Sequence, residues 1–412
     1  MSNIKELMTR KENCHYFVQR KERYCRMSTK EGNNFCGEHI YLSTEDDTSK
    51  QKNIKDKRIP CPLDNSHTCS EVKLAKHLKV CNAKKLMDAS PGYIIDGINS
   101  GDNLNIEHKA LSDLDQQVVD NIIRKVEIAY DKLPSVDELI LKHDVLASEL
   151  KNPLYGKNVK KHLIQNSSLL AHIERAGLAK DDTCFIEFGA GKGKLTYWLA
   201  QMLKNSEKTT IMLVDRSSHR HKNDNRLKNG QSTVNVIRIR ADIADLCLSK
   251  IDEIKTIKHK VGIAKHLCGA ATDLTIRCLS KLMEDDSNSG VAGLVVAFCC
   301  HHQCNYGSYT GKKFLETSGF TPEDFTILCS IASWATCGFS KIPKDKMDSS
   351  IDQITQKMEF DRKESIGRKV KSLLNWGRIE YLKNLGFQSS LYFYTTRDIS
   401  LENVCVVATR KN

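Results

Sequence analysis

The chain has 412 residues, 40% of them hydrophobic and 28% charged, with a formal net charge of +12, so it can bury a core and hold two or three domains. No apolar stretch approaches the roughly 18 residues of a membrane span, and Met1–Arg10 is too polar for a secretory signal. We therefore expect an intracellular protein, in the nucleus, the cytoplasm or both, whose 16 cysteines ligate metal or stay as buried thiols rather than form disulfides.

The first motif is a widely spaced set of metal-binding side chains. Cys14, Cys25, Cys36 and His39 supply three thiols and one imidazole, and four nitrogen or sulfur ligands are what tetrahedral zinc requires. The segment has too few apolar residues to fold without a metal. We predict a CCCH-type zinc module over residues 10–40; the alternative is a scatter of unrelated cysteines.

A second set of metal-binding side chains follows a polar linker. Cys61, His67, His77 and Cys81 supply two thiols and two imidazoles, and the last two lie four residues apart. On a short helix that spacing places them on one face. Thr68 and Glu71 have the spacing of a capping box for this helix. We predict a CHHC-type zinc finger over residues 58–85, with Cys69 left out of the ligand set.

A helical connector is expected over residues 110–158. Asp113–Tyr130 and Leu133–Leu150 both read as amphipathic helices. The remaining residues, 159–412, are expected to form the largest domain, with Ser340–Gln356 as a polar, flexible insertion.

The start of this domain carries a glycine-rich loop. The apolar run Phe185–Phe188 contains Glu187 and is followed by Gly189, Gly191 and Gly193, and a helical pattern begins at Leu195. Glycines let the backbone approach a bound ligand where a Cβ atom would clash. A dinucleotide fingerprint would need its third glycine one residue later. The motif instead resembles the first motif of class I S-adenosylmethionine methyltransferases.

Two further strand-like runs also end in acids. Thr210–Asp215 places Asp215 where a carboxylate can accept from both ribose hydroxyls of an adenosine, and Val234–Asp242 places Asp242 where it can contact the adenine amino group. The pattern favours an α/β, Rossmann-like domain that binds S-adenosyl-L-methionine. A βα fold with ordinary polar turns is the alternative.

Polar side chains also end the next two expected strands. Val261–His266 ends in Lys265 and His266, and Gly293–Cys299 is followed by Cys300, His301 and His302. In this fold, ligands approach the carboxyl ends of the strands. Cys299, Cys300, His301, His302 and Cys304 are also candidates for a third metal site, although they are too crowded for all of them to bind one ion.

Positive charge is concentrated in three places. Residues 1–90 hold half of the net excess, residues 216–240 carry seven basic side chains against Asp224 alone, and residues 362–371 form a third cluster. Basic surface near a nucleotide-cofactor site suits a polyanion such as RNA. A solvated lysine-rich surface without a partner is the alternative.

The combination of motifs in this order closely resembles one family over nearly the whole chain. That family is the eukaryotic tRNA 2′-O-methyltransferases that modify nucleotide 4 of the acceptor stem. Besides the two zinc modules and the glycine loop, the resemblance includes Lys265–Asp273, Phe298–His302 and Asn375–Arg378. It implies S-adenosyl-L-methionine as methyl donor, two structural zinc ions, the tRNA acceptor stem as substrate, and 2′-O-methylated cytidine or adenosine as product.

A ribose hydroxyl needs a nearby base or a cation before it attacks a methyl group. We expect Lys265 and His266 to act on the hydroxyl, with His301 as a second candidate, and Arg378 to hold a phosphate or the nucleotide. The amino-methylation signature is missing after Val261–His266. The Lys-Asp-Lys-Glu tetrad of many ribose methyltransferases is not evident either, which leaves the base open.

Two other functions stay open at this point. One is a non-catalytic RNA-binding or splicing adaptor with a vestigial methyltransferase fold, and the other is an RNA base methyltransferase. No DNA partner is expected, and the sequence does not point to a protein partner.

Overall fold

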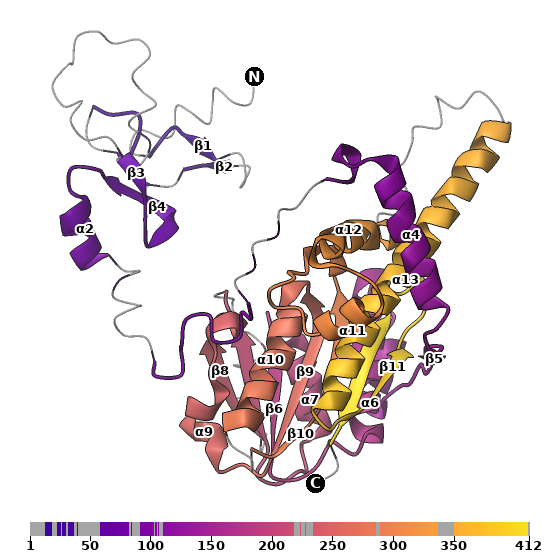
Figure 1. The fold of residues 1–412 in the computed structure, drawn as a ribbon. Coiled ribbons are helices and arrows are strands. Elements are labelled where there is room, and N and C mark those ends of the chain that lie inside the picture. The colour runs from indigo at the N-terminus through magenta and orange to yellow at the C-terminus, as the bar shows by residue number, and fades with distance from the viewer. Residues whose placement is uncertain are drawn as a thin grey trace. The chain divides into compact units, whose positions relative to one another are not determined.

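The structure is a computed structural model. It describes residues 13–18, 23–25, 27–29, 32–36, 39, 58–81, 84, 91–102, 104, 106, 110–217, 223, 227, 234–285, 289–336 and 350–410. The chain forms two compact units, residues 1–91 and residues 92–412 (Figure 1).

The first unit contains two small metal-binding modules. In the first module, β1 (Phe17–Val18) pairs with the antiparallel β2 (Arg23–Tyr24). Its core consists of the buried thiols of Cys14, Cys25 and Cys36, with Tyr16 and Phe35 packed against them. A core this small cannot hold a fold by hydrophobic burial alone, so the module depends on what the thiols bind.

The second module is a β-hairpin followed by a short helix. It is made of β3 (Arg58–Cys61), β4 (Asp64–Ser70) and α2 (Leu74–Val80). The predicted capping box is wrong, because β4 includes Thr68, whose hydroxyl accepts a hydrogen bond from Arg58, and α2 has no side-chain cap.

The second unit is built on an eight-stranded sheet with strand order β5-β11-β12-β10-β9-β6-β7-β8. The strands β8, β7, β6, β9 and β10 are parallel to one another, and β12 is antiparallel to both β10 and β11. The strands of this sheet are β5 (Asp137–Glu138), β6 (Thr183–Phe188), β7 (Thr210–Asp215), β8 (Asn235–Arg240), β9 (His259–Cys268), β10 (Val291–Cys299), β11 (Gln388–Phe393) and β12 (Val404–Thr409).

All five predicted strands of the parallel region are confirmed, with each end within two residues of the predicted one. Every residue of β6 and β10 is buried, as expected for central strands with both faces covered. The chain crosses from β6 to β7 and β8 on one side and later returns to β9 on the other. Such a reversal of direction opens a ligand crevice at the carboxyl ends of the strands on either side of it.

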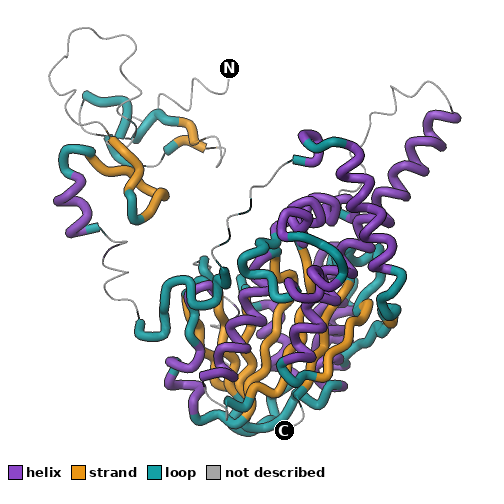
Figure 2. The backbone as a smooth tube through the Cα atoms, in the orientation of Figure 1, coloured by secondary structure: helices purple, strands orange, loops and turns teal. Residues whose placement is uncertain are grey.

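Helices cover both faces of the sheet (Figure 2). One face packs against α10 and the C-terminal half of α13, and the other packs against α6 and α7. The helices of this unit are α4 (Gln116–Tyr130), α5 (Ala147–Lys151), α6 (Lys157–Arg175), α7 (Lys194–Met202), α9 (Asp252–Lys255), α10 (Ala270–Asp285), α11 (Lys312–Thr317), α12 (Pro322–Ala332) and α13 (Ser350–Asn384).

A third apolar cluster joins helices beyond the end of the sheet. It contains buried residues of α4, α11, α12 and the middle of α13. The first connector helix is therefore confirmed as α4, whose N-cap Asp115 accepts from the backbone of Gln117. It packs within the second unit, as part of the same compact body as the sheet.

Two predicted elements differ from the structure. Leu133–Leu150 is not one helix: it holds β5, a short 3-10 turn and the start of α5. The edge of β11 offers backbone partners to this segment, as in the hydrogen bond that the N–H of Leu139 donates to the carbonyl of Phe393. Of the expected insertion at 340–356, residues 340–349 lie outside the described part, and the rest belong to α13. No helix in the described residues is long and apolar enough to cross a membrane.

Candidate functional site

The first module brings its four predicted ligands together. The ligand atoms of Cys14, Cys25, Cys36 and His39 all lie within 4.8 Å of one another. Nδ1 of His39 lies 3.4 Å from Sγ of Cys14 and 3.3 Å from Sγ of Cys36. The His39 ring stacks on Tyr16 with 4.0 Å between centroids, which fixes the direction of the imidazole.

The four ligand atoms of the second module also lie close together, and the distances between them can be compared with those around a zinc ion. Tetrahedral zinc with ordinary bond lengths places two sulfurs about 3.8 Å apart, two nitrogens about 3.3 Å apart, and a sulfur and a nitrogen about 3.5 Å apart. The observed separations are 3.8 Å for Cys61–Cys81, 3.3 Å for His67–His77 and 3.5 Å for Cys81–His67. The donor set therefore fits zinc, with His77 on α2 and Cys81 directly after it.

The glycine loop joins β6 to α7. Gly189, Gly191 and Gly193 all have positive φ, between 51° and 67°. A Cβ atom on Gly191 would meet no atom within 4 Å, so the loop is open on that side, whereas one on Gly189 would approach Leu267 to 3.0 Å. The loop thus combines a left-handed backbone with open space beside it, as a site needs where backbone approaches a ligand.

The acids near the carboxyl ends of β6 and β7 accept hydrogen bonds from neighbouring residues. Glu187 is buried in β6 and accepts hydrogen bonds from the backbone and hydroxyl of Thr196, at the start of α7. Burial raises the pKa of Glu187 to about 7, against the opposite effect of these hydrogen bonds. Asp215, at the end of β7, accepts from the N–H of Gly191 at 2.7 Å and from that of Ser217 at 2.7 Å. Asp215 therefore helps to fix the backbone of the glycine loop at Gly191.

Asp242 follows β8 and is partly exposed. Its carboxylate accepts from the N–H of Ala244 and lies 3.6 Å from the guanidinium of Arg216. Glu187, Asp215 and Asp242 thus lie at or next to the carboxyl ends of three neighbouring strands, at one edge of the sheet. Acceptors in a row beside an open glycine loop fit a ligand with hydroxyl and amino donors, such as adenosine.

Lys265 lies near the end of β9, at the same edge. Its ammonium donates to Oδ1 of Asn166 on α6 at 2.6 Å and to the carbonyl of His162 at 3.4 Å. Burial lowers the pKa of Lys265 to about 8, although the charge of Glu187 acts in the other direction. The amine is therefore close to the range in which a lysine can exchange protons at neutral pH.

His266 follows in an unusual backbone conformation, with φ of 58°. Its Nε2 lies 2.6 Å from Oε1 of Gln165 on α6. Burial lowers the pKa of His266 to about 4, so the ring is neutral at pH 7. Because Oε1 can only accept, Nε2 carries the proton and Nδ1 keeps its lone pair.

His301 and Arg378 lie in the interior. Nε2 of His301 lies 2.8 Å from Oδ1 of Asn375, and burial lowers the pKa of His301 well below its ordinary value. The Arg378 side chain is 1% exposed, and its guanidinium donates to both oxygens of Asp273 at 3.2 and 2.7 Å and to Asn375 at 3.1 Å. The arginine that was expected to hold a phosphate is thus engaged by a buried carboxylate.

The five residues considered for a third metal site separate in the structure. His301 turns to Asn375, and the sulfur of Cys304 accepts from Arg378 at 3.1 Å. Cys299 and Cys300 instead gather with Cys268, a residue outside the predicted set.

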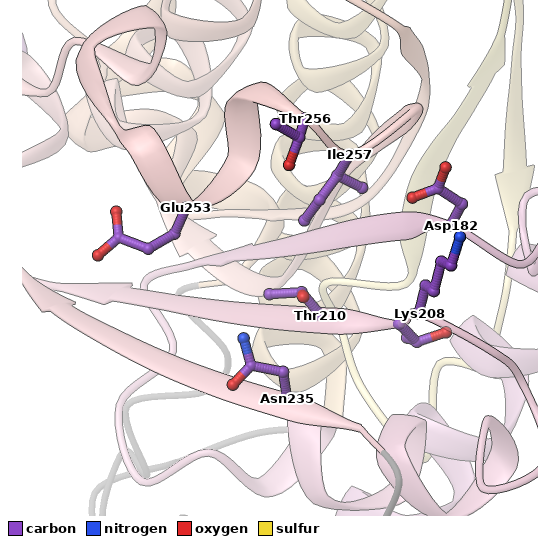
Figure 3. A pocket seen from close by; sticks show the side chains of 8 residues that line it. Asp182, Lys208, Thr210, Asn235, Glu253, Thr256 and Ile257 are labelled. Carbon is purple, nitrogen blue, oxygen red and sulfur yellow. The ribbon is translucent and has the colours of Figure 1, made fainter.

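A cleft of about 460 Å³ lies at the opposite edge of the sheet (Figure 3). It is lined by residues at the starts of β6, β7 and β8 and around α9, among them Asp182, Lys208, Asn235 and Glu253. The candidate residues follow the carboxyl ends of the strands, so this cleft is separate from the site.

Sequence comparisons show which family these features belong to. The family model for methyltransferase TRM13 matches residues 164–409, which is more than half of the chain. The chain belongs to the TRM13 methyltransferase family. The CCCH zinc finger of TRM13 proteins matches residues 12–40, and the U11-48K-like CHHC zinc finger matches residues 58–82. The predicted combination of two zinc fingers and a methyltransferase domain is therefore confirmed.

Relatives in the TRM13 family match almost the full chain. Proteins of Mus musculus and Homo sapiens, each named tRNA:m(4)X modification enzyme TRM13 homolog, are 34% identical to it over 96% of this chain and 94% of their own length. The tRNA:m(4)X modification enzyme TRM13 of Debaryomyces hansenii is 32% identical over 95% of this chain and 90% of its own.

Two site residues were missed in the sequence. Asn166 and Gln165 lie on α6, before the glycine loop, and contact Lys265 and His266. The sequence does hold a signal, which is a run of four consecutive polar residues in α6. The structure buries all of them: Gln165, Asn166, Ser167 and Ser168. Buried polar groups need partners, so such a run marks a helix that faces other polar groups.

Proposed function

We propose that this chain is a tRNA methyltransferase that acts on nucleotide 4 of the acceptor stem. It transfers the methyl group of S-adenosyl-L-methionine to the ribose 2′-hydroxyl of a cytidine or adenosine. The observation that carries the proposal is the full-length match to relatives named as tRNA modification enzymes. The acids and the open glycine loop at one sheet edge support the cofactor assignment.

The cofactor would lie along the carboxyl ends of β6, β7 and β8. The backbone at Gly189, Gly191 and Gly193 would approach it closely, since no Cβ atom stands in the way at Gly191. Asp215 would accept from the ribose hydroxyls and Asp242 from the adenine amino group. When bound, S-adenosyl-L-methionine supplies an electrophilic methyl group next to its positive sulfur.

Lys265 is proposed as the group that takes the hydroxyl proton. With a pKa of about 8, the amine is neutral in about one chain in ten at pH 7, and this fraction can accept a proton. The 2′-hydroxyl would give its proton to Nζ of Lys265 as it takes the methyl group that bound S-adenosyl-L-methionine would supply. Asn166 holds Nζ in place at 2.6 Å.

His266 and Arg378 receive positioning roles in this proposal. The neutral ring of His266, held by Gln165, presents Nδ1 as an acceptor for a polar group of the nucleotide. Arg378 anchors the start of α10 to α13 through Asp273, and His301 supports it through their shared contact with Asn375. The zinc fingers are proposed to bind the tRNA backbone, since residues 1–90 hold half of the positive excess.

The direct test is product analysis with matched substrates. The zinc-loaded full chain is incubated with labelled S-adenosyl-L-methionine and an unmodified tRNA transcript, and the digested nucleosides are identified by mass. The control transcript differs only in a 2′-deoxyribose at nucleotide 4. We expect a 2′-O-methylnucleoside from the first transcript and no methylation at that position in the second.

Other products would overturn parts of the proposal. A methylated base, formed equally on the 2′-deoxy transcript, would keep the cofactor site and remove the ribose assignment. A protein that binds tRNA but has no measurable affinity for S-adenosyl-L-methionine would be an RNA-binding adaptor.

A further inference from the structure

Three cysteine thiols meet at the carboxyl ends of two neighbouring strands. Cys268 ends β9, Cys299 ends β10, and Cys300 follows at once. Their sulfur atoms all lie within 4.8 Å of one another, the same limit that both zinc fingers meet. Cys268 is exposed, Cys300 is half-buried and Cys299 is buried, so the trio opens to solvent on one side.

The backbone is shaped to bring these thiols together. Lys265 pairs with Ala297, but the next pairs are Leu267 with Phe298 and Cys268 with Cys299. His266 is therefore an extra residue in β9, a β-bulge, and without it Cys268 would not lie opposite Cys299. Cys300 then turns the chain back with φ of 49° and ψ of 45°.

The backbone at His266 and Cys300 is strained, which indicates that a function requires this conformation. Four non-glycine residues in the described chain have positive φ, and two of them, His266 and Cys300, are the residues that align the trio. Such conformations are costly for ordinary side chains and gather at functional sites. The N–H of Cys300 is also fixed, since it donates to the carboxylate of Glu402, which in turn pairs with Lys371 at 2.8 Å.

Three converging thiols are suited to a metal ion more than to a disulfide, which uses only two. The sulfurs of Cys268 and Cys299 lie 3.1 Å apart, well beyond a disulfide bond of about 2.05 Å. Around zinc they would separate to about 3.8 Å, the distance between Cys61 and Cys81 in the second finger. Because Cys268 is exposed, its side chain has room for this movement.

We propose that Cys268, Cys299 and Cys300 form a third metal site, for a thiophilic divalent ion such as zinc, with the fourth coordination position open. Three protein ligands and one open position distinguish it from the closed four-ligand sets of the fingers. Three thiolates give a zinc ion a net charge of −1, so the ion is a weak Lewis acid. Its role is to tie the end of β9, which carries Lys265 and His266, to the end of β10. The site does not depend on the proposed tRNA substrate.

The test is the zinc content of the full chain at equilibrium with micromolar free zinc, measured after dialysis by mass spectrometry of the metal. We expect three zinc ions per chain. The double variant C268A/C300A, which removes two side chains that are not fully buried, should hold two. Cys247→Ala, in the turn after β8, is the matched control and should hold three.

The wild-type measurement decides the proposal even if a variant fails to fold. Two zinc ions in the wild-type chain, with Cys268, Cys299 and Cys300 alkylated rapidly as free thiols, would overturn it. A Cys268–Cys299 disulfide in the wild-type chain, found by peptide mass without reduction, would overturn it in favour of a redox pair. Equal zinc loss in C268A/C300A and in Cys247→Ala would also count against the site.

Discussion

Nζ of Lys265 lies 2.6 Å from Oδ1 of Asn166, and this contact links the carboxyl end of β9 to α6. The amine is half-buried, and its pKa is lowered to about 8. It lies at the edge of the sheet that also carries the acids at the carboxyl ends of β6, β7 and β8.

Methyl transfer should depend on the protonation of Lys265. A base must be neutral to take a proton, so the single-turnover rate at saturating cofactor and tRNA should rise with pH and level off above a pKa of about 8. Lys265→Met should lower this rate by about 10²- to 10⁴-fold and remove the pH dependence. Lys260→Met, at the opposite end of the same strand, should retain the pH profile. A Lys265→Met enzyme with the wild-type rate would exclude this role.

Cofactor binding should be lost in Gly191→Asp. The new side chain would fill the open space beside the loop with a second anion next to Asp215, whose carboxylate already accepts from Gly191. Calorimetry should show at least a hundredfold weaker binding of S-adenosyl-L-methionine. Gly177→Asp is a close control, because Gly177 also has a positive φ and open space but lies after α6, outside the loop. Equal affinities of the two variants would contradict the cofactor assignment.

Breaking the pair between Arg378 and Asp273 should destabilise the second unit. Both side chains are at most 1% exposed, and removal of one partner leaves an uncompensated buried charge, at a cost of about 3–5 kcal/mol. Arg378→Met should lower the free energy of unfolding in denaturant by about this amount. Lys383→Met breaks an exposed pair with Glu380 and should cost under about 1 kcal/mol. If Arg378→Met lowered the free energy of unfolding by no more than Lys383→Met does, the structural role of Arg378 would be wrong, and phosphate binding would again be the better explanation.

The second finger should lose its metal in His77→Ala. Nε2 of His77 lies 3.2 Å from Sγ of Cys61 and 3.3 Å from Nε2 of His67, so its loss opens the donor set. The zinc content should fall by one ion per chain, and tRNA affinity should fall while cofactor affinity stays unchanged. His15→Ala, which removes a histidine outside both donor sets, should keep the metal. Unchanged zinc in His77→Ala would count against the ligand assignment.

Much of the site could be read from the chain because its signals are local. The strands β6 and β7 are short apolar runs with an acid at or next to the last residue, and β8 alternates apolar and polar residues. The four zinc ligands of each finger lie close together in the sequence. What could not be read depends on pairing between distant segments. Cys268 joins Cys299 only through the bulge at His266, and the segment after Leu133 follows the edge of β11, which lies far along the chain.

The long helix α13 contributes buried side chains to two separate apolar clusters. Val370 and Leu373 belong to the helical cluster with α4 and α12, whereas Ile379 and Leu382 belong to the cluster beneath the sheet. A helix shared in this way makes the two clusters thermodynamically interdependent, because neither can lose α13 without exposing apolar surface in the other. Amide hydrogen exchange should therefore find the helices beyond the sheet and the central strands opening together, as one cooperative folding unit.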